Sequence, residues 1–194
     1  MKSATDPIQL FASLYRQVYT SDIPESAAVT LATSTGDGRP SARVVLLKGF
    51  DEHGFVFYTN LESRKAQEIK ANSNGALCFY WPAISYQVRI EGEMQQVSDQ
   101  EADAYFATRP RGSQIGAWAS RQSAPLKSRE ELQTRFSEFE KRFVGQTVPR
   151  PVFWSGFRLM PNRIEFWQGR ENRLHERTLY VRRGNNWTAT LLFP

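Results

Sequence analysis

The residues best suited to chemistry are cations that stand beside hydroxyl or phenol groups. In one segment, Ser63, Arg64 and Lys65 come at the predicted start of a helix. Free backbone N–H groups at such a start bind anions, whereas positive side chains there cost about 0.3–1 kcal/mol each. A bound phosphate would remove that conflict. A solvated helix start explains the same residues equally well when they are considered alone.

A second segment follows the same logic. Tyr105 and Arg109 are four residues apart in a predicted helix, so their side chains project from one face. Pro110 ends that helix, and Ser113 lies where the next one is expected to begin. A phenol, a guanidinium and a hydroxyl could therefore converge on a second anion. A loop with surface arginines is the simpler interpretation when no other context is considered.

The third segment surrounds one of the two histidines. In an extended conformation, Arg173, His175 and Arg177 would point to one side and place cationic donors around an imidazole. A single histidine beside arginines is more often a surface hydrogen-bonding residue than a catalyst, but the preceding Phe166-Trp167 favours a site. His53 stands in a predicted tight turn and is expected at the surface.

Composition excludes several classes of chemistry. The chain has 194 residues, a formal charge of +5, one cysteine and two histidines. An intrachain disulfide is impossible, and no metal site is expected because a zinc site needs several Cys and His ligands. No apolar run is long enough to cross a membrane, and the cations are dispersed, so neither a membrane nor a nucleic acid is an expected partner. A cytoplasmic protein is predicted.

The elements that must position these residues are mostly strands. Asp6-Pro7 predicts the start of an amphipathic helix that ends before the break at Asp22-Ile23-Pro24. Further helices are expected near 63–72, 98–109, 113–119 and 128–143, two of them opened by the capping boxes Ser98/Glu101 and Ser128/Glu131. Strands are expected near 27–33, 42–48, 55–59, 76–81, 86–97, 156–160, 164–167, 178–182 and 187–193.

This order of elements predicts a mainly β, α+β protein. We expect a closed antiparallel barrel of about seven or eight strands with peripheral helices, in a single domain over residues 1–194. Val44, Val45, Leu46 and Leu47 form an unbroken apolar run, which predicts that their strand is buried on both faces. No glycine-rich dinucleotide or P-loop fingerprint occurs, because Gly36-Asp37-Gly38 is typical of a hairpin turn.

Several blocks of sequence resemble the pyridoxamine 5′-phosphate oxidase family. They occur in the family's order and span nearly the whole chain: Arg43-Val44-Val45-Leu46-Leu47-Lys48, Phe57-Tyr58-Thr59-Asn60 with Ser63-Arg64-Lys65, Arg109 to Trp118, and Ile164 to Gly169 with Arg173-Leu174-His175. The resemblance makes the surface explanations of the individual segments much weaker.

The resemblance implies an FMN-binding split β-barrel, an antiparallel, Greek-key-like barrel with peripheral helices. It implies a homodimer with FMN at the interface, and a dimerisation and substrate segment near 151–194. The implied reaction oxidises pyridoxamine 5′-phosphate and pyridoxine 5′-phosphate to pyridoxal 5′-phosphate. Oxygen would accept the electrons and give hydrogen peroxide, with ammonia released from the amine.

The resemblance also implies roles for individual residues. The expected FMN contacts are Arg43, Lys48, Tyr58, Thr59, Arg64, Lys65, Gln87, Gln122, Ser123, Trp167 and Arg177. The expected substrate contacts are Lys48, Tyr105, Arg109, Ser113, Arg173 and His175. Arg173 and His175 are the expected catalytic pair, because in the family these two residues lie over the substrate ring.

Three features depart from the family pattern. Members usually begin with a segment carrying Arg and Tyr that folds over the substrate, whereas this chain reaches its first helix almost at once. Tyr86 stands where Arg is frequent, and Leu191 to Pro194 replace an Arg-Leu-small-Pro ending. Two alternative functions stay open: a split-barrel flavoprotein with another substrate or flavin reductase activity, and a non-catalytic pyridoxal phosphate or FMN-binding protein.

Overall fold

The computed structural model describes residues 6–20 and 26–194, so the predicted break at 22–24 lies outside the described residues. The helices are α1 (Pro7–Thr20), α2 (Arg64–Ala71), α3 (Asp99–Thr108), α4 (Arg111–Ala119) and α5 (Arg129–Arg142), with short 3₁₀ turns at Pro82–Ile84 and Glu171–Arg173. The strands are β1 (Ala28–Ser34), β2 (Pro40–Leu46), β3 (Gly49–Asp51), β4 (Gly54–Asn60), β5 (Asn74–Trp81), β6 (Tyr86–Gln96), β7 (Trp154–Gln168), β8 (Glu176–Arg183) and β9 (Asn186–Leu192).

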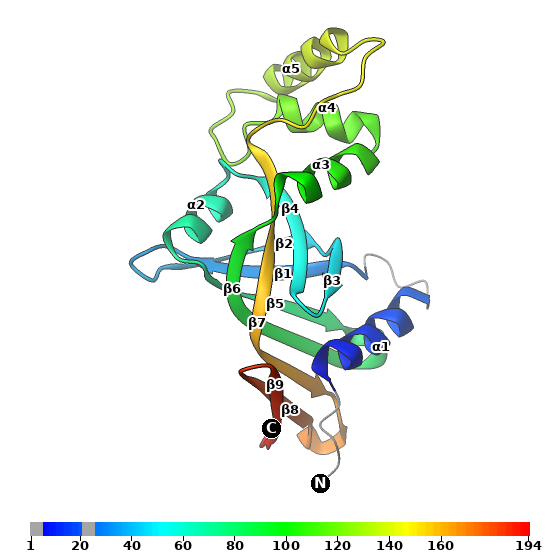
Figure 1. The fold of residues 1–194 in the computed structure, drawn as a ribbon, viewed down its shortest axis with the longest axis vertical. Helices are drawn as coiled ribbons and strands as arrows, with labels where there is room; N and C mark the ends of the chain where they lie inside the picture. Colours follow the sequence, from blue (N-terminus) through cyan, green and yellow to red (C-terminus); the bar gives the residue numbers. More distant parts are fainter. Residues whose placement is uncertain (1–5, 21–25) are drawn as a thin grey trace.

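All nine described strands belong to one antiparallel sheet. Its main order is β2-β1-β5-β6-β7-β4-β3, and the hairpin β8-β9 extends from β7. The two ends of this order, β2 and β3, are consecutive in the chain and are joined by Leu47 and Lys48. The sheet therefore curls back on itself, with α3, α4 and α5 gathered at one end and the β8-β9 hairpin at the other (Figure 1).

The predicted mainly β fold, a split antiparallel barrel with peripheral helices, is confirmed, but the described strands do not close into a complete barrel. Within the described residues no hydrogen-bonded ladder joins β2 to β4, and the chain crosses between the two edges of the sheet at Leu47 and Lys48. The Lys48 N–H donates to the Val56 carbonyl over 2.8 Å, which fixes this crossing without closing the sheet. The gap between β2 and β4 opens into the candidate site.

Strand β7 runs from the helices at one end of the molecule to the β8-β9 hairpin at the other (Figure 1). The sequence predicts two strands here, near 156–160 and 164–167, but the structure has one strand of 15 residues. Pro161 is tolerated because it lies at a β-bulge: Glu91 pairs with Arg163 and Gly92 with Pro161, so Asn162 has no partner on β6. A Cβ at Gly92 would lie 2.0 Å from the Met160 carbonyl oxygen, so the bulge requires glycine.

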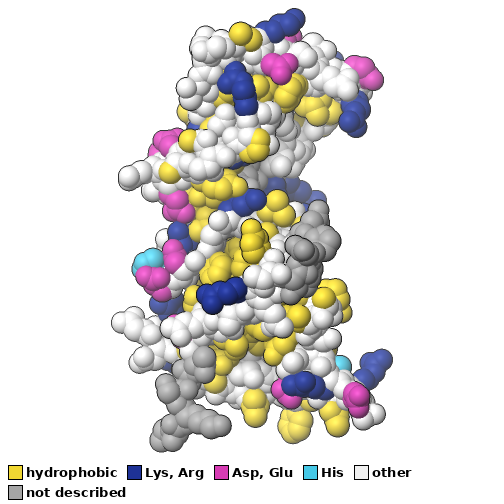
Figure 2. Space-filling model, turned by 90° about the vertical axis from the view of Figure 1, so that its right-hand side faces the viewer, with side chains coloured by type: hydrophobic (Ala, Val, Ile, Leu, Met, Phe, Trp, Pro, Cys, Tyr) yellow, Lys and Arg dark blue, Asp and Glu magenta, His cyan; other side chains and the backbone are white. Residues whose placement is uncertain are grey.

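Strand β2 also corrects an expectation. Its burial alternates along the strand instead of covering both faces, and Val44 and Leu46 are 66% and 44% exposed. Burial on both faces would require a second layer over the strand, and no described element of this chain covers its outer side. Figure 2 shows hydrophobic side chains exposed along much of one face of the molecule.

The core explains why the strands curl. Phe11 of α1 is fully buried, and its ring contacts Phe55 and Phe79 at centroid distances of 4.9 and 5.1 Å. A second cluster joins α3, α4 and α5 to the start of β7 through Phe106, Ile115, Phe143 and Trp154. The serine half of both predicted capping boxes forms, since the side chains of Ser98 and Ser128 accept hydrogen bonds from the N–H groups three residues later.

In the part of the chain that the structure describes, no helix is long and apolar enough to span a membrane. Strand β7 begins next to α3, α4 and α5 and ends next to the β8-β9 hairpin. The strands at both ends of the molecule therefore belong to one sheet. A single domain over 1–194 stays a prediction.

Candidate active site

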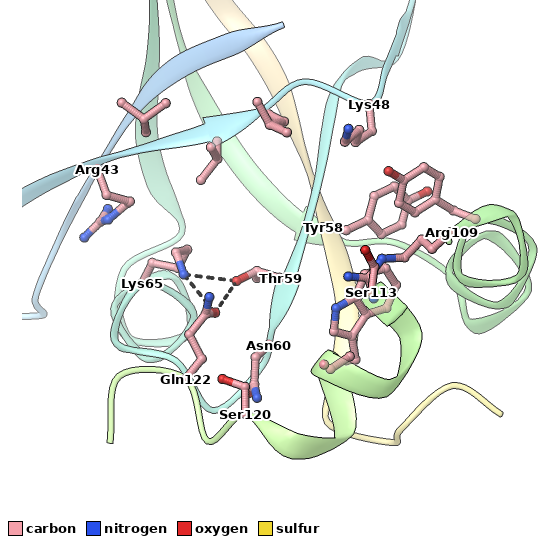
Figure 3. Close-up of a pocket in the computed structure, with 17 residues that line it drawn as sticks. Arg43, Lys48, Tyr58, Thr59, Asn60, Lys65, Arg109, Ser113, Ser120 and Gln122 are labelled. Carbon is pink, nitrogen blue, oxygen red and sulfur yellow. Dashed lines mark hydrogen bonds between the residues drawn. The ribbon is translucent and has the colours of Figure 1, made fainter. Parts of the chain in front are cut away.

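A cavity of about 610 Å³ opens where β2 and β4 separate. This volume lies within the range of roughly 300–1,000 Å³ that is usual for small-molecule sites. Its walls come from β2, β4, α2, α3, α4 and the start of β7 (Figure 3). Nine of the predicted site residues line it: Arg43, Lys48, Tyr58, Thr59, Lys65, Tyr105, Arg109, Ser113 and Gln122.

One side of the cavity is a polar corner around Lys65. The Lys65 ammonium donates to Thr59 Oγ1 and to Gln122 Oε1, both over 3.1 Å, and Thr59 donates to Gln122 over 3.0 Å (Figure 3). Burial, and next the positive charge of Arg43, lower the pKa of Lys65. No carboxylate pairs with this ammonium among the described residues, so an anion in the cavity would stabilise its charged form.

Arg43 is held by a buried carboxylate that the sequence analysis missed. Its Nη2 donates to Glu68 over 3.1 Å, and its Nη1 donates to the Leu31 carbonyl and to Thr33. Glu68 also accepts hydrogen bonds from Thr33, Ser41 and Arg64. Burial raises the pKa of the Glu68 carboxyl, but these four donors outweigh it and lower the pKa to about 2.

Ser63 does not contribute the free hydroxyl that the sequence predicts. Its Oγ donates to the Asn60 carbonyl over 2.7 Å and accepts from Lys65 over 3.3 Å, and the side chain is fully buried. The Ser63 hydroxyl therefore stabilises the turn into α2 and the Lys65 side chain. An anion at this end of the cavity would contact the cations and Gln122 instead.

The opposite side of the cavity is an aromatic stack with one unpaired guanidinium. The rings of Tyr58, Tyr105 and Trp154 are nearly parallel and all contact one another, with centroid distances of 4.0 Å from Tyr58 to Tyr105, 5.4 Å from Tyr58 to Trp154 and 6.2 Å from Tyr105 to Trp154. Arg109 lies 4.7 Å from the Trp154 centroid, and its Nη1 is buried without a hydrogen-bond partner. An unpaired buried donor is costly, so this atom indicates a site for an acceptor.

The neighbours of Arg109 suit an anion. Ser113 lies in the first turn of α4, and Lys48 lines the same part of the cavity (Figure 3). Burial lowers the pKa of Arg109, which Tyr105 partly offsets. Burial, followed by the charges of Glu101 and Tyr105, raises the pKa of Tyr58 to about 12, so its phenol keeps its proton. The predicted grouping of Tyr105, Arg109 and Ser113 around one space is confirmed.

Five of the seven remaining predicted residues lie at the other end of β7 and on the strands and turn next to it, and we call them the C-terminal cluster: Gln87, Trp167, Arg173, His175 and Arg177. Trp167 pairs across the sheet with Gln87 on β6 and with Arg177 on β8, so these three side chains share one face. The His175 ring lies 4.6 Å from the Trp167 ring. Arg177 donates to Glu165 over 2.8 Å.

The segment before His175 is not extended as predicted. Glu171–Arg173 form a 3₁₀ turn in which Asn172 and Arg173 have φ values of 54° and 60°. Left-handed backbone is strained for such residues and often accompanies a functional constraint. The turn lets His175 Nδ1 accept a hydrogen bond from the Arg170 N–H over 3.1 Å. Alternation of side chains along a strand therefore does not apply to Arg173.

The two groups of predicted residues do not meet within one chain. Trp154 lines the cavity, and Trp167 lies 13 residues further along the same strand. A straight strand of that length spans about 43 Å. Figure 1 places the helices of the cavity and the β8-β9 hairpin at opposite ends of the molecule. Arg64 and Ser123 line neither the cavity nor this cluster, and both are exposed.

Other cavity residues were missed by the sequence analysis. Asn60, Ser120 and Trp154 line the cavity, and Glu68 holds one of its arginines. Only Glu68 carried a local signal, because Arg64 and Glu68 have the i, i+4 spacing of a helical ion pair. His53 is exposed, as expected. Among residues 6–20 and 26–194, no group of three metal-binding side chains is close enough to hold an ion.

Comparison with known proteins assigns the chain to a family. Residues 17–143 match the family described as pyridoxamine 5′-phosphate oxidase. The chain belongs to the pyridoxamine 5′-phosphate oxidase family. Residues 154–194 match the C-terminal dimerisation region of pyridoxine 5′-phosphate oxidase, which contains most of the C-terminal cluster. Membership of the pyridoxamine 5′-phosphate oxidase family points to a flavin as the cofactor.

Relatives of the family cover the whole chain. Pyridoxine/pyridoxamine 5′-phosphate oxidase from Rubrobacter xylanophilus is 59% identical over 97% of this chain and 87% of its own. The enzyme of the same name from Myxococcus xanthus is 55% identical over 97% of this chain and 92% of its own.

Solved structures agree with this fold. PhzG from Burkholderia lata 383, in complex with tetrahydrophenazine-1-carboxylic acid, has a TM-score of 0.94 and 33% identity, with 100% of this chain and 95% of PhzG covered. A pyridoxamine 5′-phosphate oxidase-related, FMN binding protein from Nostoc punctiforme has a TM-score of 0.77 at 18% identity, with 98% of this chain and 100% of its own covered. This second likeness shows the fold alone.

Proposed function

We propose that this chain is an FMN-dependent oxidase that converts pyridoxamine 5′-phosphate and pyridoxine 5′-phosphate to pyridoxal 5′-phosphate. The amine reaction consumes oxygen and water and releases ammonia and hydrogen peroxide. The observation that carries the proposal is the buried, unpartnered Nη1 of Arg109, a residue that lines a cavity of about 610 Å³. Family membership supplies the reaction class.

We place the substrate phosphate at Lys48, Tyr105, Arg109 and Ser113. Arg109 offers a planar fork of donors, which matches phosphate oxygens better than a point charge does. Its guanidinium is packed over Trp154, so the fork is already oriented before an anion arrives. A substrate without phosphate would leave this buried donor unpaired, which explains how the site would select phosphorylated substrates.

FMN is placed along the other side of the same cavity. Lys65, Arg43 and Gln122 would hold its phosphate, and Thr59 and Tyr58 would lie beside the cofactor. Arg64 and Ser123 would reach it from the rim of the cavity. The depressed pKa of Lys65 supports this placement, because a dianion would offset the burial and the repulsion from Arg43 that lower it. When bound there, FMN would supply a two-electron acceptor for the hydride of the substrate C4′ carbon, and oxygen would reoxidise it.

A second copy of the chain would complete each site. Gln87, Trp167, Arg173, His175 and Arg177 lie at the other end of β7, and residues 154–194 match a dimerisation region. Exposed Leu174, Leu191 and Phe193 give this end an apolar surface that suits burial against a partner. In a twofold dimer, the C-terminal cluster of one copy faces the cavity of the other.

His175 would act as a hydrogen-bond donor. Its Nδ1 accepts the Arg170 N–H, so the neutral imidazole carries its proton on Nε2. In this orientation the Nδ1 lone pair is already used, and Nε2–H can only donate. Arg173 and His175 would hold the substrate ring against the flavin from the open side, which supplies orientation and excludes water.

Anaerobic mixing with pyridoxamine 5′-phosphate tests the function. The purified protein should be yellow, and the substrate should bleach its visible flavin absorption, whereas pyridoxamine without phosphate should do so at least a hundredfold less efficiently. A flavin reductase, or a flavoprotein with another substrate, would not be bleached by either compound. A protein that cannot be reconstituted with FMN would favour a non-catalytic pyridoxal phosphate binder.

A cytoplasmic location stays part of this proposal. It is supported by the single half-buried Cys78, which needs no oxidising compartment, and by the soluble substrates of the proposed reaction.

A further inference from the structure

A buried carboxylate joins the cations on the FMN side of the cavity. Glu68 is 4% exposed and lies on α2, yet its Oε2 accepts hydrogen bonds from Thr33 on β1 over 2.5 Å and from Ser41 on β2 over 2.5 Å. Arg43 donates to the same oxygen over 3.1 Å, and Arg64 donates to Oε1 over 2.8 Å. One side chain therefore ties α2 to two strands and holds two guanidinium groups.

The way in which Glu68 holds Arg64 leaves that arginine able to bind an anion. The hydrogen bond uses Nε, and both terminal nitrogens of Arg64 have no protein partner among the described residues. Those two nitrogens are the ones that bind a phosphate with paired hydrogen bonds. The Arg64 side chain is 65% exposed, so without Glu68 its fork would sample many rotamers.

The charges around Glu68 also suit a phosphate. Arg43, Arg64 and Lys65 carry three positive charges on or beside α2, and Glu68 carries one negative charge. The net charge of +2 matches a phosphate monoester, which carries about −1.5 to −2 near neutral pH. Glu68 keeps the two guanidinium groups close to each other and to Lys65 despite their mutual repulsion.

We propose that Glu68 is a positioning residue for the FMN phosphate, acting through Arg43 and Arg64 and without contacting the flavin itself. The inference rests on the proposed FMN site. It predicts that loss of Glu68 weakens the recognition of the phosphate group and leaves the recognition of the flavin ring intact.

The test compares FMN with riboflavin, which has the same ring and no phosphate. In Glu68→Gln, an amide N–H₂ would face donors, and one acceptor oxygen would be lost. We expect the Kd of FMN, measured by quenching of flavin fluorescence in the apoprotein, to rise at least about tenfold, the effect of one lost charged hydrogen bond. The Kd of riboflavin should change by less than about twofold.

Three further variants sharpen the test. Glu68→Asp keeps the charge but shortens the reach, and we expect it to weaken FMN binding to a similar extent. Glu62→Gln removes a charge from an exposed residue just before α2 and should leave both Kd values unchanged. Ser41→Ala removes one donor to Glu68 and one acceptor of Arg43 Nη2 but leaves the ion pair between Arg43 and Glu68, so it tests the network even if Glu68→Gln fails to fold. Its expected effect is about threefold on FMN alone.

The outcomes separate this proposal from the FMN site itself. Equal weakening of FMN and riboflavin would make Glu68 merely structural and would overturn the proposal, as would tighter FMN binding or an Asp variant that behaves like wild type. If the wild-type apoprotein binds FMN no better than riboflavin, the phosphate site itself is wrong and the proposal falls with it.

Discussion

The half of the molecule around the cavity and the half around the C-terminal cluster hold arginines in the same way. They differ in which cations have no carboxylate partner. In the cavity half, buried Glu68 holds Arg43 and Arg64; in the C-terminal half, Glu165, with a side chain 9% exposed, holds Arg89 and Arg177. Each carboxylate thus fixes two guanidinium groups of its own half.

The difference lies in the remaining cations. Among the described residues, Lys48, Lys65 and Arg109 of the cavity have no carboxylate partner, whereas in the C-terminal half only Arg173 of the predicted site arginines lacks one. A half with several unpaired cations is arranged to receive anions. The C-terminal half has one unpaired cation among its predicted site residues, and its ion pair with Glu165 holds Arg177 in a position that a partner can use.

The largest expected effect concerns the unpaired cation of the cavity. Arg109→Ala should lower kcat/KM for pyridoxamine 5′-phosphate about a thousandfold, roughly 4 kcal/mol, because a desolvated charge pair with the phosphate is lost. Steady-state peroxide formation measures this. The matched control is Arg111→Ala, since Arg111 binds the carbonyls of Phe143 and Gln146 and does not line the cavity. A loss of less than tenfold in Arg109→Ala would place the substrate phosphate elsewhere.

The next prediction concerns acid stability. The pKa of Glu68 is lowered from 4.5 to about 2 in the folded chain, so its contribution is full above pH 4.5 and is lost as the pH falls towards 2. The shift corresponds to roughly 3 kcal/mol. Urea unfolding of wild type and Glu68→Gln should differ by that order at pH 7, and the difference should shrink below pH 4.5. A pH-independent difference would mean that the carboxylate charge does not matter.

Subunit mixing tests whether the two halves act across a dimer. Arg109→Ala and Arg173→Glu should each be nearly inactive, but heterodimers formed by unfolding and refolding both together would contain one intact site. Random pairing then restores about one quarter of wild-type activity, far above either parent. Each variant refolded alone is the control. No recovery would mean that each site is built within one chain.

The smallest effect concerns His175. If it donates through Nε2, His175→Gln keeps a donor near that position and should slow anaerobic flavin reduction less than about threefold, whereas His175→Ala should slow it about tenfold. Stopped-flow absorbance with pyridoxamine 5′-phosphate measures both rates. If both variants slow flavin reduction equally, and the pH–rate profile loses one of its pH-dependent limbs, His175 would instead be a proton acceptor.

Local signals predicted the helices and turns well. The caps at Ser98 and Ser128 placed α3 and α5 to within about a residue, because a cap depends on residues three positions apart. Non-local packing produced the errors. The apolar run of β2 predicts burial on both faces, but whether a strand is covered depends on other elements, and Val44 is 66% exposed. The pattern near 156–167 predicts two strands, because a bulge that joins them depends on the partner strand.

The site was predicted as a set of residues but not as an arrangement. Tyr105, Arg109 and Ser113 were grouped correctly because helix periodicity and a proline fix their relative positions. Glu68 could not be recognised as the centre of a network, since its partners Thr33 and Arg43 lie 35 and 25 residues away in the sequence. Spacing also gave no sign that the C-terminal cluster lies at the opposite end of the sheet.

The bulge at Asn162 determines which way the two halves face. Thirteen residues separate Trp154 from Trp167, and in an uninterrupted strand an odd separation would turn the two rings to opposite sides of the sheet. Because Asn162 is unpaired, the alternation of side chains between the two faces of the sheet shifts by one residue at the bulge. Both tryptophans therefore point to the same side. Deleting this one residue would turn the side chains of one half of β7 to the opposite face of the sheet, so Trp154 and Trp167 would no longer point to the same side.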